Sequence, residues 1–367
     1  MKICYLSNTA IPSSMASSIQ IIKMCEAFSD LNNEVTLITT NVKKKKFDTF
    51  SFYNVRRKFT IKRLTKFKSF PLGINYYLFS FFSILESLKY KPEIYITRNF
   101  FTCFLLVLLK KRTIIELHHD ISIESRTVKF LVRYSNFLNS SYLKKAVAIT
   151  NGVKKEFTEK KYIQSNKIVV LPSGSSLKQK KNLPIKNKFF KIGYFGSLYK
   201  SRGFELISKL AKIDNKNQYF LFGDLENLSL QKHRKFKSNL NICSHIPYRD
   251  ISKKMFEMDI LVIPYVSSIT VAGDVGDITR FTSPLKLFDY LTAGKVIICS
   301  DFKVLKEVIS SKNAIFIKNF KNPFSWKMEI DKLANLYEKQ ITISLNNQKL
   351  SKTYTLKERA KKILKMI

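Results

Sequence analysis

The feature that most constrains the fold is an alternation of short apolar segments with segments of helical periodicity along almost the whole chain. The apolar segments are rich in β-branched and aromatic residues, as buried strands are. They occupy residues 2–6, 34–39, 93–97, 113–117, 146–150 and 167–171, and then 190–195, 219–222, 260–263, 296–299 and 314–317. Such alternation predicts parallel sheets covered by helices on both faces.

One segment interrupts the alternation. Residues 171–188 combine Pro, Gly, Ser and Lys without any hydrophobic periodicity, as interdomain linkers do. A length of 367 residues also suits two domains. We therefore predict an α/β protein with two doubly wound, Rossmann-like domains. Ligands of such sheets bind at the carboxyl ends of the strands, and a cleft between the two domains is the expected site.

The net charge points to a polyanion. The chain carries 65 Lys and Arg against 27 Asp and Glu, a formal charge of +38. Part of this excess follows from a composition rich in Lys, Asn, Ile and Phe, and the rest indicates nucleic acid, anionic lipid or a phosphorylated substrate. Because Lys outnumbers the forked Arg that reads base edges, nucleic acid is the less favoured partner.

Cysteine usage and the apolar runs exclude several classes. The five Cys residues are widely spaced and predict neither a disulfide framework nor a zinc site, which fits a reducing compartment. The first residues lack the apolar core of a signal peptide. The longest apolar runs, 76–85 and 100–109, are about half the length of a bilayer-spanning helix. We predict that both are buried helices.

Residues 283–301 form the most informative segment. Ser283 suits an N-cap and Pro284 the first helical position. A helix start attracts phosphate, and Lys286 in the first turn opposes the helix dipole unless an anion binds there. Asp289, one turn further on, can accept hydrogen bonds from sugar hydroxyls. The alternative is an amphipathic helix whose Lys and Asp face solvent.

A glycine-containing turn at 193–203 (GYFGSLYKSRG) forms a second candidate. It follows a predicted strand, and its glycines allow a close backbone approach, while Lys200 and Arg202 could grip a diphosphate. The pattern matches neither a dinucleotide-binding fingerprint nor a P-loop, so its weight comes from its combination with the segment around Lys286.

These residues carry a resemblance to a known family. Residues 283–301 resemble the donor-binding signature of retaining glycosyltransferases of the GT-B fold, family 4 (glycosyl transferases group 1), in which an acidic residue stands five positions before a Gly and a buried strand ends in Ser-Asp. The turn 195–203 is similar to the phosphate-binding loop of that family. Further similar segments are 147–153, 170–174, 219–224 and 354–363.

The resemblance implies a division of labour between the two domains. Residues 1–175 would form an acceptor-binding Rossmann-like domain and 176–188 the linker. Residues 189–345 would bind the nucleotide-sugar donor, and 346–367 would form a helix that crosses back to the first domain.

Two departures from the family pattern concern the donor site. Of the acidic pair, Asp289 fills the second position, but Phe281 stands at the first. Asp274, Asp277 or backbone groups could take the missing role of holding the donor sugar. We interpret the departures as variation, with loss of activity as the alternative.

The phosphate loop of the family carries Arg and then Lys, where this chain has Ser197 and Arg202. We therefore expect Arg202 and Lys286 to clamp the diphosphate as catalytic residues, and Asp289 to bind the ribose. The complete expected donor-binding set is Gly196, Ser197, Lys200, Asp277, Ser283, Pro284, Leu285 and Asp289.

In the N-terminal domain, the residues after strand 113–117 are the expected sugar contacts. Glu116-x-His118 resembles a family motif, and His118 is the third expected catalytic residue, in contact with the transferred sugar. A structural histidine is the alternative, and adjacent histidines are poorly placed to bind a metal. The residues expected on the acceptor side are Ser13, Ser14, Arg98 and His119.

Residues 43–68 mix basic residues with aromatic ones, among them Phe50, Phe52 and Phe59. This mixture favours docking on an anionic membrane surface, where lipid-linked acceptors reside, and RNA binding is the competing interpretation. We expect a cytoplasmic protein that lies peripherally on the inner face of the cell membrane.

The predicted function is transfer of a hexose-type sugar from a nucleotide-diphosphate sugar to a glycan or lipid-linked acceptor, in the biosynthesis of surface polysaccharide or lipopolysaccharide. The resemblance implies retention of configuration without a protein nucleophile, and neither a cofactor nor a metal. The alternatives are a sugar-nucleotide epimerase of the same fold and a non-catalytic scaffold that binds membranes or RNA.

Overall fold

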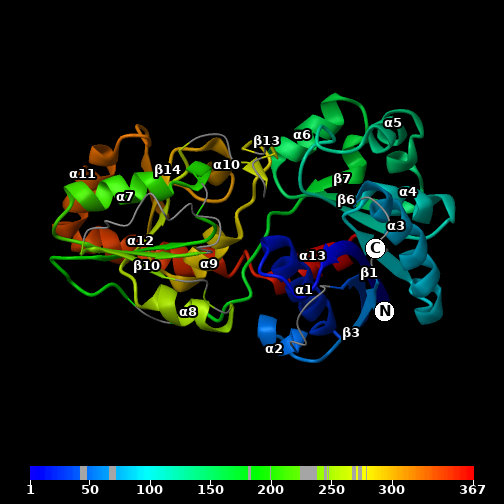
Figure 1. Cartoon of the computed structure of the whole chain (residues 1–367), viewed down its shortest axis with the longest axis horizontal. Helices are drawn as coiled ribbons and strands as arrows, with labels where there is room; N and C mark the ends of the chain where they lie inside the picture. The colour runs from blue at the N-terminus through cyan, green and yellow to red at the C-terminus, as the bar shows by residue number, and fades with distance from the viewer. Residues whose placement is uncertain are drawn as a thin grey trace. The chain divides into compact units, whose positions relative to one another are not determined.

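A computed structural model describes residues 1–41, 48–65, 72–180, 183–198, 200–223, 238–243, 246, 248–266, 270–271, 275–277 and 279–367. The chain divides into two compact units. The first unit comprises Met1–Ser173 together with Leu356–Ile367, and the second comprises Gly174–Thr355. Both are drawn in Figure 1.

The described part of the first unit contains a parallel sheet of seven strands in the order β3-β2-β1-β4-β5-β6-β7. β1 lies in the interior of the sheet, where Tyr5 pairs with Leu37 on one side and Ile96 on the other. The strands are β1 (Lys2–Ala10), β2 (Glu34–Thr40), β3 (Thr60–Leu64), β4 (Ile94–Thr97), β5 (Thr113–Leu117), β6 (Leu143–Ala148) and β7 (Ile168–Val170).

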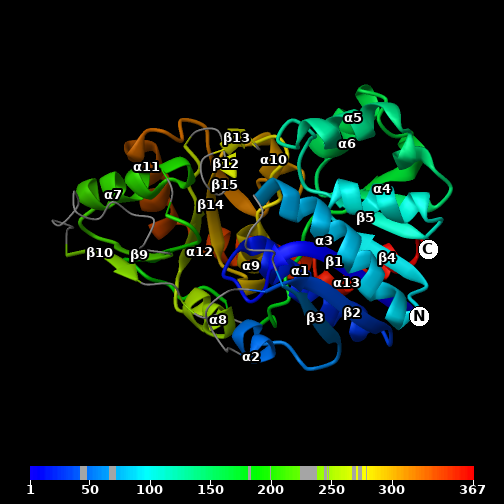
Figure 2. The ribbon, with the colours of Figure 1, turned by 45° about the vertical axis from the view of Figure 1, so that its right-hand side comes forward.

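Side chains of β1 alternate between two cores, as the two-residue period of a strand requires. Ile3 and Tyr5 belong to a cluster that includes helices α1 (Ala16–Ser29) and α13 (Leu356–Leu364). Cys4 and Leu6 belong to another, with α3 (Leu72–Ser87) and α4 (Phe100–Leu108). Both faces of the sheet are therefore covered by helices, as Figure 2 shows.

Polar caps begin the helices that follow β4, β5 and β6. Asn99 accepts a hydrogen bond from the N–H of Thr102 at the start of α4, and Ser125 and Thr150 do the same for α5 (Arg126–Tyr134) and α6 (Asn151–Glu159). The short helix α2 (Thr49–Tyr53) begins at Asp48 in the same way. These caps fix the loops at the carboxyl edge of the sheet.

The described part of the second unit contains a parallel sheet of six strands in the order β10-β9-β8-β11-β14-β15. The strands are β8 (Lys191–Phe195), β9 (Gln218–Phe222), β10 (Leu240–Cys243), β11 (Ile260–Ile263), β14 (Val296–Ser300) and β15 (Ala314–Ile317). A short antiparallel pair, β12 (Thr270–Val271) and β13 (Val275–Asp277), stands apart from it.

Helices cover both faces of this sheet as well. One core joins α7 (Phe204–Ile213) and α11 (Pro323–Ala334) to the sheet through Tyr194 and Val262. The other joins α8 (Tyr248–Phe256) and α9 (Leu285–Ala293) to the opposite face. The remaining helices are α10 (Lys303–Lys306) and α12 (Tyr337–Ser351).

Three segments differ from the sequence prediction. Strands β3 and β10 were not predicted, because each lies at the edge of its sheet and lacks a continuous apolar run. The helix predicted over 346–367 is two helices, since α12 ends at Ser351 and α13 begins at Leu356. Between them the carbonyl of Tyr354 accepts a hydrogen bond from the N–H of Ser175 at 2.9 Å.

The prediction that residues 76–85 form a buried helix is wrong for one side of that helix. The run lies within α3, where Phe81, Phe82 and Leu85 are exposed. The buried positions of α3 are shared by Phe79 and Ile84 with three serines, and the remaining large apolar side chains of the run stay at least partly exposed.

Candidate functional site

Two candidate sites follow from the structure, one in each unit. The site in the second unit lies where β8 and β11 end and α9 begins. β8 and β11 are parallel neighbours, so the loops after them meet at one edge of the sheet, which is where ligands of such sheets bind. We call the group formed by Tyr194, Gly196, Arg202, Tyr265 and Lys286 the cationic site.

Lys286 is the most unusual residue of the cationic site. Its Nζ is buried, lies 3.9 Å from the centre of the Tyr194 ring and has no hydrogen-bond partner among the described residues. Burial, and then the positive charge of Arg202, hold the pKa of the Lys286 ammonium well below its usual range. A charged group in this condition is costly unless a ligand compensates it.

Arg202 supplies a second cation at the same place. Its guanidinium lies 5.4 Å from the centre of the Tyr265 ring, and Lys286 Nζ lies 6.0 Å from that ring. Gly203, the next residue, has a φ of +88°, and a Cβ there would lie 1.8 Å from the carbonyl oxygen of Pro264. The glycine therefore lets the Arg202 loop pack against the end of β11, where the two cations can share one polyanion.

The turn after β8 makes room for Lys286. Gly196 has a φ of +141°, and a Cβ built on it would lie 2.7 Å from Lys286 Nζ. The N–H of Gly196 donates to the carbonyl of Phe222 at 2.9 Å, and the Tyr194 hydroxyl donates to the carbonyl of Ser197 at 2.6 Å. The turn is therefore held on both sides of the glycine.

The start of α9 differs by one residue from the prediction. Pro284, not Ser283, is the N-cap, because its ψ of 122° is extended, and Leu285 is the first helical residue. Asp289 is buried and accepts a hydrogen bond from the Ser175 hydroxyl at 2.6 Å. Its expected contact with ribose stays a prediction.

The acidic candidates for the missing family position lie largely outside the described residues. Asp274 is one of these, and only the backbone of Asp277 is described, in β13 opposite Thr270. The side chain of Lys200 is likewise not described, while Phe281, in place of the first acid, is buried.

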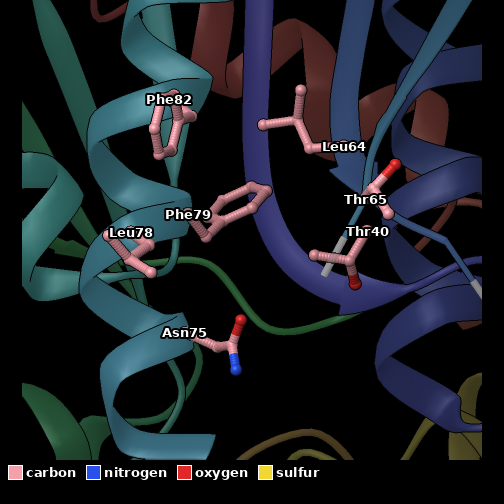
Figure 3. Close-up of a pocket in the computed structure, with 7 residues that line it drawn as sticks. All are labelled: Thr40, Leu64, Thr65, Asn75, Leu78, Phe79 and Phe82. Atoms are coloured by element: carbon pink, nitrogen blue, oxygen red, sulfur yellow. The ribbon is translucent and has the colours of Figure 1, made fainter. Parts of the chain in front are cut away.

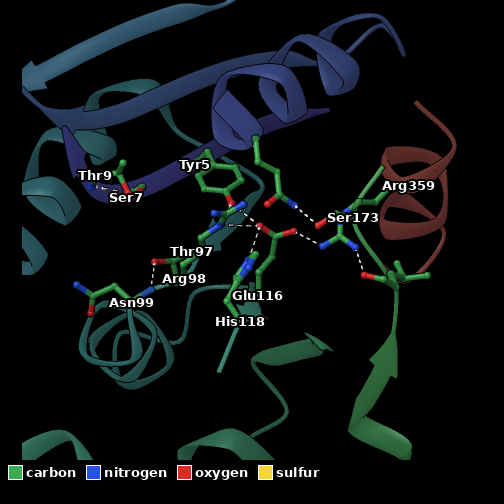
Figure 4. Close-up of polar contacts among 12 residues, drawn as sticks. Tyr5, Ser7, Thr9, Thr97, Arg98, Asn99, Glu116, His118, Ser173 and Arg359 are labelled. Atoms are coloured by element: carbon green, nitrogen blue, oxygen red, sulfur yellow. Dashed lines mark hydrogen bonds and ion pairs between the residues drawn. The ribbon is translucent and has the colours of Figure 1, made fainter. Parts of the chain in front are cut away.

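The site in the first unit is a buried cluster of charges around Glu116, at the end of β5 (Figure 4). Glu116 Oε2 accepts hydrogen bonds from the Tyr5 hydroxyl and, at 3.1 Å, from Arg98 Nε. Glu116 Oε1 accepts one from Arg359 at 2.5 Å, and Arg359 also donates to the carbonyls of Leu171 and Pro172.

This cluster sets the charge of His118. Burial alone would raise the pKa of Glu116, but the charges of Arg359 and Arg98 outweigh it and hold that pKa well below its usual range. His118 Nε2 lies 3.9 Å from Glu116 Oε2, and burial followed by the charge of Arg98 lowers the pKa of His118 to about 3. The imidazole is therefore neutral at physiological pH and can hydrogen-bond a sugar hydroxyl without carrying charge.

The residues expected on the acceptor side differ in their burial and in their contacts. Arg98 is mostly buried in the Glu116 cluster, where its Nε also donates to the Tyr5 hydroxyl at 2.9 Å, and its acceptor-side role stays a prediction. His119 contacts the carbonyl of Asp120 at 2.7 Å through Nδ1. The N–H of Ser13 donates to the Tyr53 hydroxyl at 2.6 Å, whereas Ser14 is exposed.

The prediction that residues 43–68 dock on a membrane stays a prediction, and the structure describes three of their Phe side chains. Phe59 is buried, and Phe50 packs against it with ring centres 5.3 Å apart, while Phe52 contacts the same core. Phe59 therefore does not face outward, while Phe50 and Phe52 are half-buried. The KKKK run at 43–46 and Phe67 lie outside the described residues.

Sequence reasoning missed several residues of both sites. Tyr194 and Tyr265, whose rings lie beside the two cations, look like ordinary strand residues in the sequence, and no motif marks them. Arg359 is 243 positions from Glu116, so only the fold reveals their ion pair. Tyr5 is likewise hidden in an apolar strand.

Over the described residues, no group of three or more His, Cys, Asp or Glu side chains is arranged to hold a metal ion. Among the helices described, none combines the length and apolarity needed to cross a membrane.

Comparisons with known proteins show similarity at the level of structure. Neither a family model nor a curated protein sequence matches this chain. A glycosyltransferase from Rickettsia africae has a TM-score of 0.71 at 15% identity, over 100% of this chain and 97% of that one. Anabaena HepE in complex with UDP and glucose has a TM-score of 0.71 at 14% identity, over 100% and 98%.

Sucrose-phosphate synthase from Thermosynechococcus elongatus has a TM-score of 0.73 at 12% identity, covering 100% of this chain and 98% of its own. At these identities the likeness concerns the fold. Two parallel-sheet α/β units and glycosyltransferases as structural neighbours together identify the fold of this protein as GT-B.

Proposed function

We propose that the protein is a retaining glycosyltransferase that uses a nucleotide-diphosphate sugar as donor. The observation that carries the proposal is the buried, uncompensated ammonium of Lys286 beside Arg202. A diphosphate has the charge and the size to engage both cations, and few other metabolite groups do. HepE, a structural neighbour, has been solved with UDP and with UDP-glucose, which supports a nucleotide diphosphate here.

In the proposed reaction the bond between the anomeric carbon and the diphosphate oxygen breaks, and the acceptor hydroxyl oxygen bonds to that carbon. The proton of the acceptor hydroxyl passes to the departing diphosphate, so that no protein nucleophile is needed. Negative charge grows on the diphosphate as the bond breaks. Arg202 and Lys286 stabilise it most in the transition state, which is what speeds the reaction.

The acceptor domain contributes a neutral imidazole. His118, with its pKa lowered to about 3, would hydrogen-bond a hydroxyl of the transferred sugar and would not repel the cationic oxocarbenium character at the anomeric carbon. We propose a hexose as the transferred sugar. The acceptor we propose is a glycan or lipid-linked intermediate of surface polysaccharide or lipopolysaccharide, and WaaG, a structural neighbour, is a glycosyltransferase involved in lipopolysaccharide biosynthesis.

The test is release of nucleoside diphosphate from a panel of nucleotide sugars, with and without a lipid and glycan extract as acceptor. We expect acceptor-dependent release from one donor and a product whose anomeric configuration, read by NMR, matches that donor. Lys286→Met should lower the rate by about 100-fold or more. An inverted product would refute retention, and no release with any donor would refute the transferase assignment.

A further inference from the structure

The outer face of α3 is apolar where a surface helix is normally polar. Ile74, Phe81 and Leu85 on the helix, and Leu88 in the 3-10 turn that follows it, are 44%, 54%, 47% and 44% exposed. Their spacing of seven, four and three residues places them on one side of the helix. Together with Phe82 they form what we call the α3 stripe.

The inner face of the same helix combines three serines with two large apolar side chains, Phe79 and Ile84. Ser80, Ser83 and Ser87 are fully buried, and Ser80 accepts a hydrogen bond from Thr102 of α4 at 2.9 Å. Small side chains at these positions let α3 approach its neighbours closely, while Phe81, Phe82 and Leu85 stay exposed on the other side. A contiguous exposed stripe of this kind indicates that the α3 stripe is covered by something apolar when the protein works.

The apolar surface extends beyond α3. Helix α4 packs beside α3, and Leu108 and Leu109 at its end are exposed. Helix α5 packs against α4, and its Phe130 and Tyr134 are exposed with ring centres 5.0 Å apart. Figure 2 shows α3 and α4 as neighbours on one face of the sheet.

Cations follow this surface closely in the sequence. Lys89 and Lys91 come directly after the α3 stripe, Lys110 follows Leu109, and all three are exposed. The charged residue within α3 is Glu86, which is paired with Lys62 and Lys89. An apolar stripe rimmed by lysines is the pattern of a helix that lies in the interface of a membrane with anionic lipids.

We propose that the α3 stripe, with the exposed ends of α4 and α5, docks on an anionic lipid bilayer. A second copy of the chain is a poorer occupant, because a symmetric contact would bring the lysines of one copy against those of the other, at a net charge of +38 each. A nucleic acid would engage the lysines but leave Phe81 and Leu85 uncovered. An anionic bilayer covers the apolar side chains and also attracts the lysines.

A bilayer docked on the α3 stripe would lie close to the carboxyl edge of the sheet, where substrates bind. Beside α3 a hollow is lined by Asn75, Leu78, Phe79 and Phe82 from the helix, and by Thr40, Leu64 and Thr65 (Figure 3). Thr40 and Leu64 are the last residues of β2 and β3. Phe82 belongs to both the stripe and the hollow, so a bilayer on α3 adjoins the carboxyl edge of the sheet.

The test is sedimentation with vesicles of phosphatidylcholine, with and without phosphatidylglycerol. The test variant is Phe81→Ser with Leu85→Ser, and the matched control is Phe324→Ser with Met328→Ser, two exposed apolar residues on α11. We expect the wild type to bind anionic vesicles, the α3 variant to bind about tenfold or more weakly, and the control to bind like the wild type.

All four positions are exposed, so both variants should melt like the wild type, and a melting scan checks this. Equal binding by the α3 variant and the wild type would overturn the proposal, as would equal losses in both variants or equal binding to vesicles with and without phosphatidylglycerol. Light scattering adds a further arm. If the wild type is a dimer and the α3 variant is a monomer, the surface would be assigned to a second copy of the chain instead.

Discussion

The ammonium nitrogen of Lys286 lies 3.9 Å from the centre of the Tyr194 ring, in a buried position where no described residue accepts a hydrogen bond from it. The aromatic face offers a cation some electrostatic attraction, but less than water or a carboxylate would. Arg202 adds repulsion. The free protein therefore disfavours the charged form of Lys286, and a bound anion would remove that cost.

Replacing Lys286 should raise the stability of the protein and abolish ligand binding. Lys286→Met removes the buried charge and keeps the apolar stem, so we expect the free energy of unfolding to rise by about 1 kcal/mol. Binding of UDP, used as a diphosphate probe, should be lost. Urea unfolding and calorimetric titration measure the two effects, with Lys209→Met, an exposed lysine on α7, as the control. A marked loss of stability in Lys286→Met would contradict this account of the site.

A side chain at position 196 should damage the same site by sterics. Gly196→Ala places a methyl group 2.7 Å from Lys286 Nζ, at a φ of +141° that alanine rarely adopts. We expect a loss of about 1–3 kcal/mol in stability together with weaker UDP binding. Gly73→Ala is the matched control, because no atom lies within 4 Å of its added Cβ, and it should leave both properties unchanged. Unaltered UDP binding in Gly196→Ala would argue against Lys286 as a ligand of the diphosphate.

Binding of a diphosphate should be coupled to proton uptake. The pKa of Lys286 is lowered in the free protein and a nearby diphosphate raises it, so the complex holds more protons than the free protein. Affinity therefore falls as pH rises through the interval between the two pKa values. Calorimetry in buffers of different ionisation heat, above about pH 7.5 where the phosphates are fully ionised, measures the uptake. Zero uptake by the wild type, or equal uptake by Lys286→Met, would contradict the coupling.

Sequence patterns predicted the loops of the cationic site because strands β8 and β11 are central and continuously apolar. Their ends, and hence the positions of Arg202 and Lys286, follow from the pattern. Edge strands β3 and β10 were missed since Lys62 and Arg63, or Asn241, interrupt their apolar runs. The position of Lys286 Nζ over an aromatic ring depends on tertiary packing, which no local pattern encodes.

The cluster in the first unit shows the same limit. Glu116 and His118 were singled out from their place after a strand, but the arginines that fix their charge states come from β4's end and from α13. Such pairings between distant segments become visible only in the folded chain. The burial of Phe59 was hidden for the same reason, because a basic and aromatic composition does not reveal which side chains turn inward.

Acid should destabilise the first unit through His118. Its pKa is about 3 in the folded protein against 6.5 in the unfolded chain, so the unfolded state binds more protons below about pH 6.5 and stability falls as pH falls. The expected slope is about 1 kcal/mol per pH unit between about pH 6 and pH 4. The lowered pKa of Glu116 adds a further loss below about 4.5. Urea midpoints across this range measure the slope, and His118→Asn should flatten it; an equally steep slope in that variant would assign the effect elsewhere.

The most direct test of the central claim, that Arg202 and Lys286 bind the diphosphate of a nucleotide donor, is thermal melting against a panel of nucleotides and nucleotide sugars near millimolar concentration. We expect one nucleoside diphosphate and its sugar to raise Tm in the wild type and in Lys209→Met, but not in Arg202→Ala or Lys286→Met. The corresponding nucleoside, which lacks the phosphates, should raise Tm in none of them. A wild-type Tm that no nucleotide raises, or an equal rise in all four proteins, would contradict the claim.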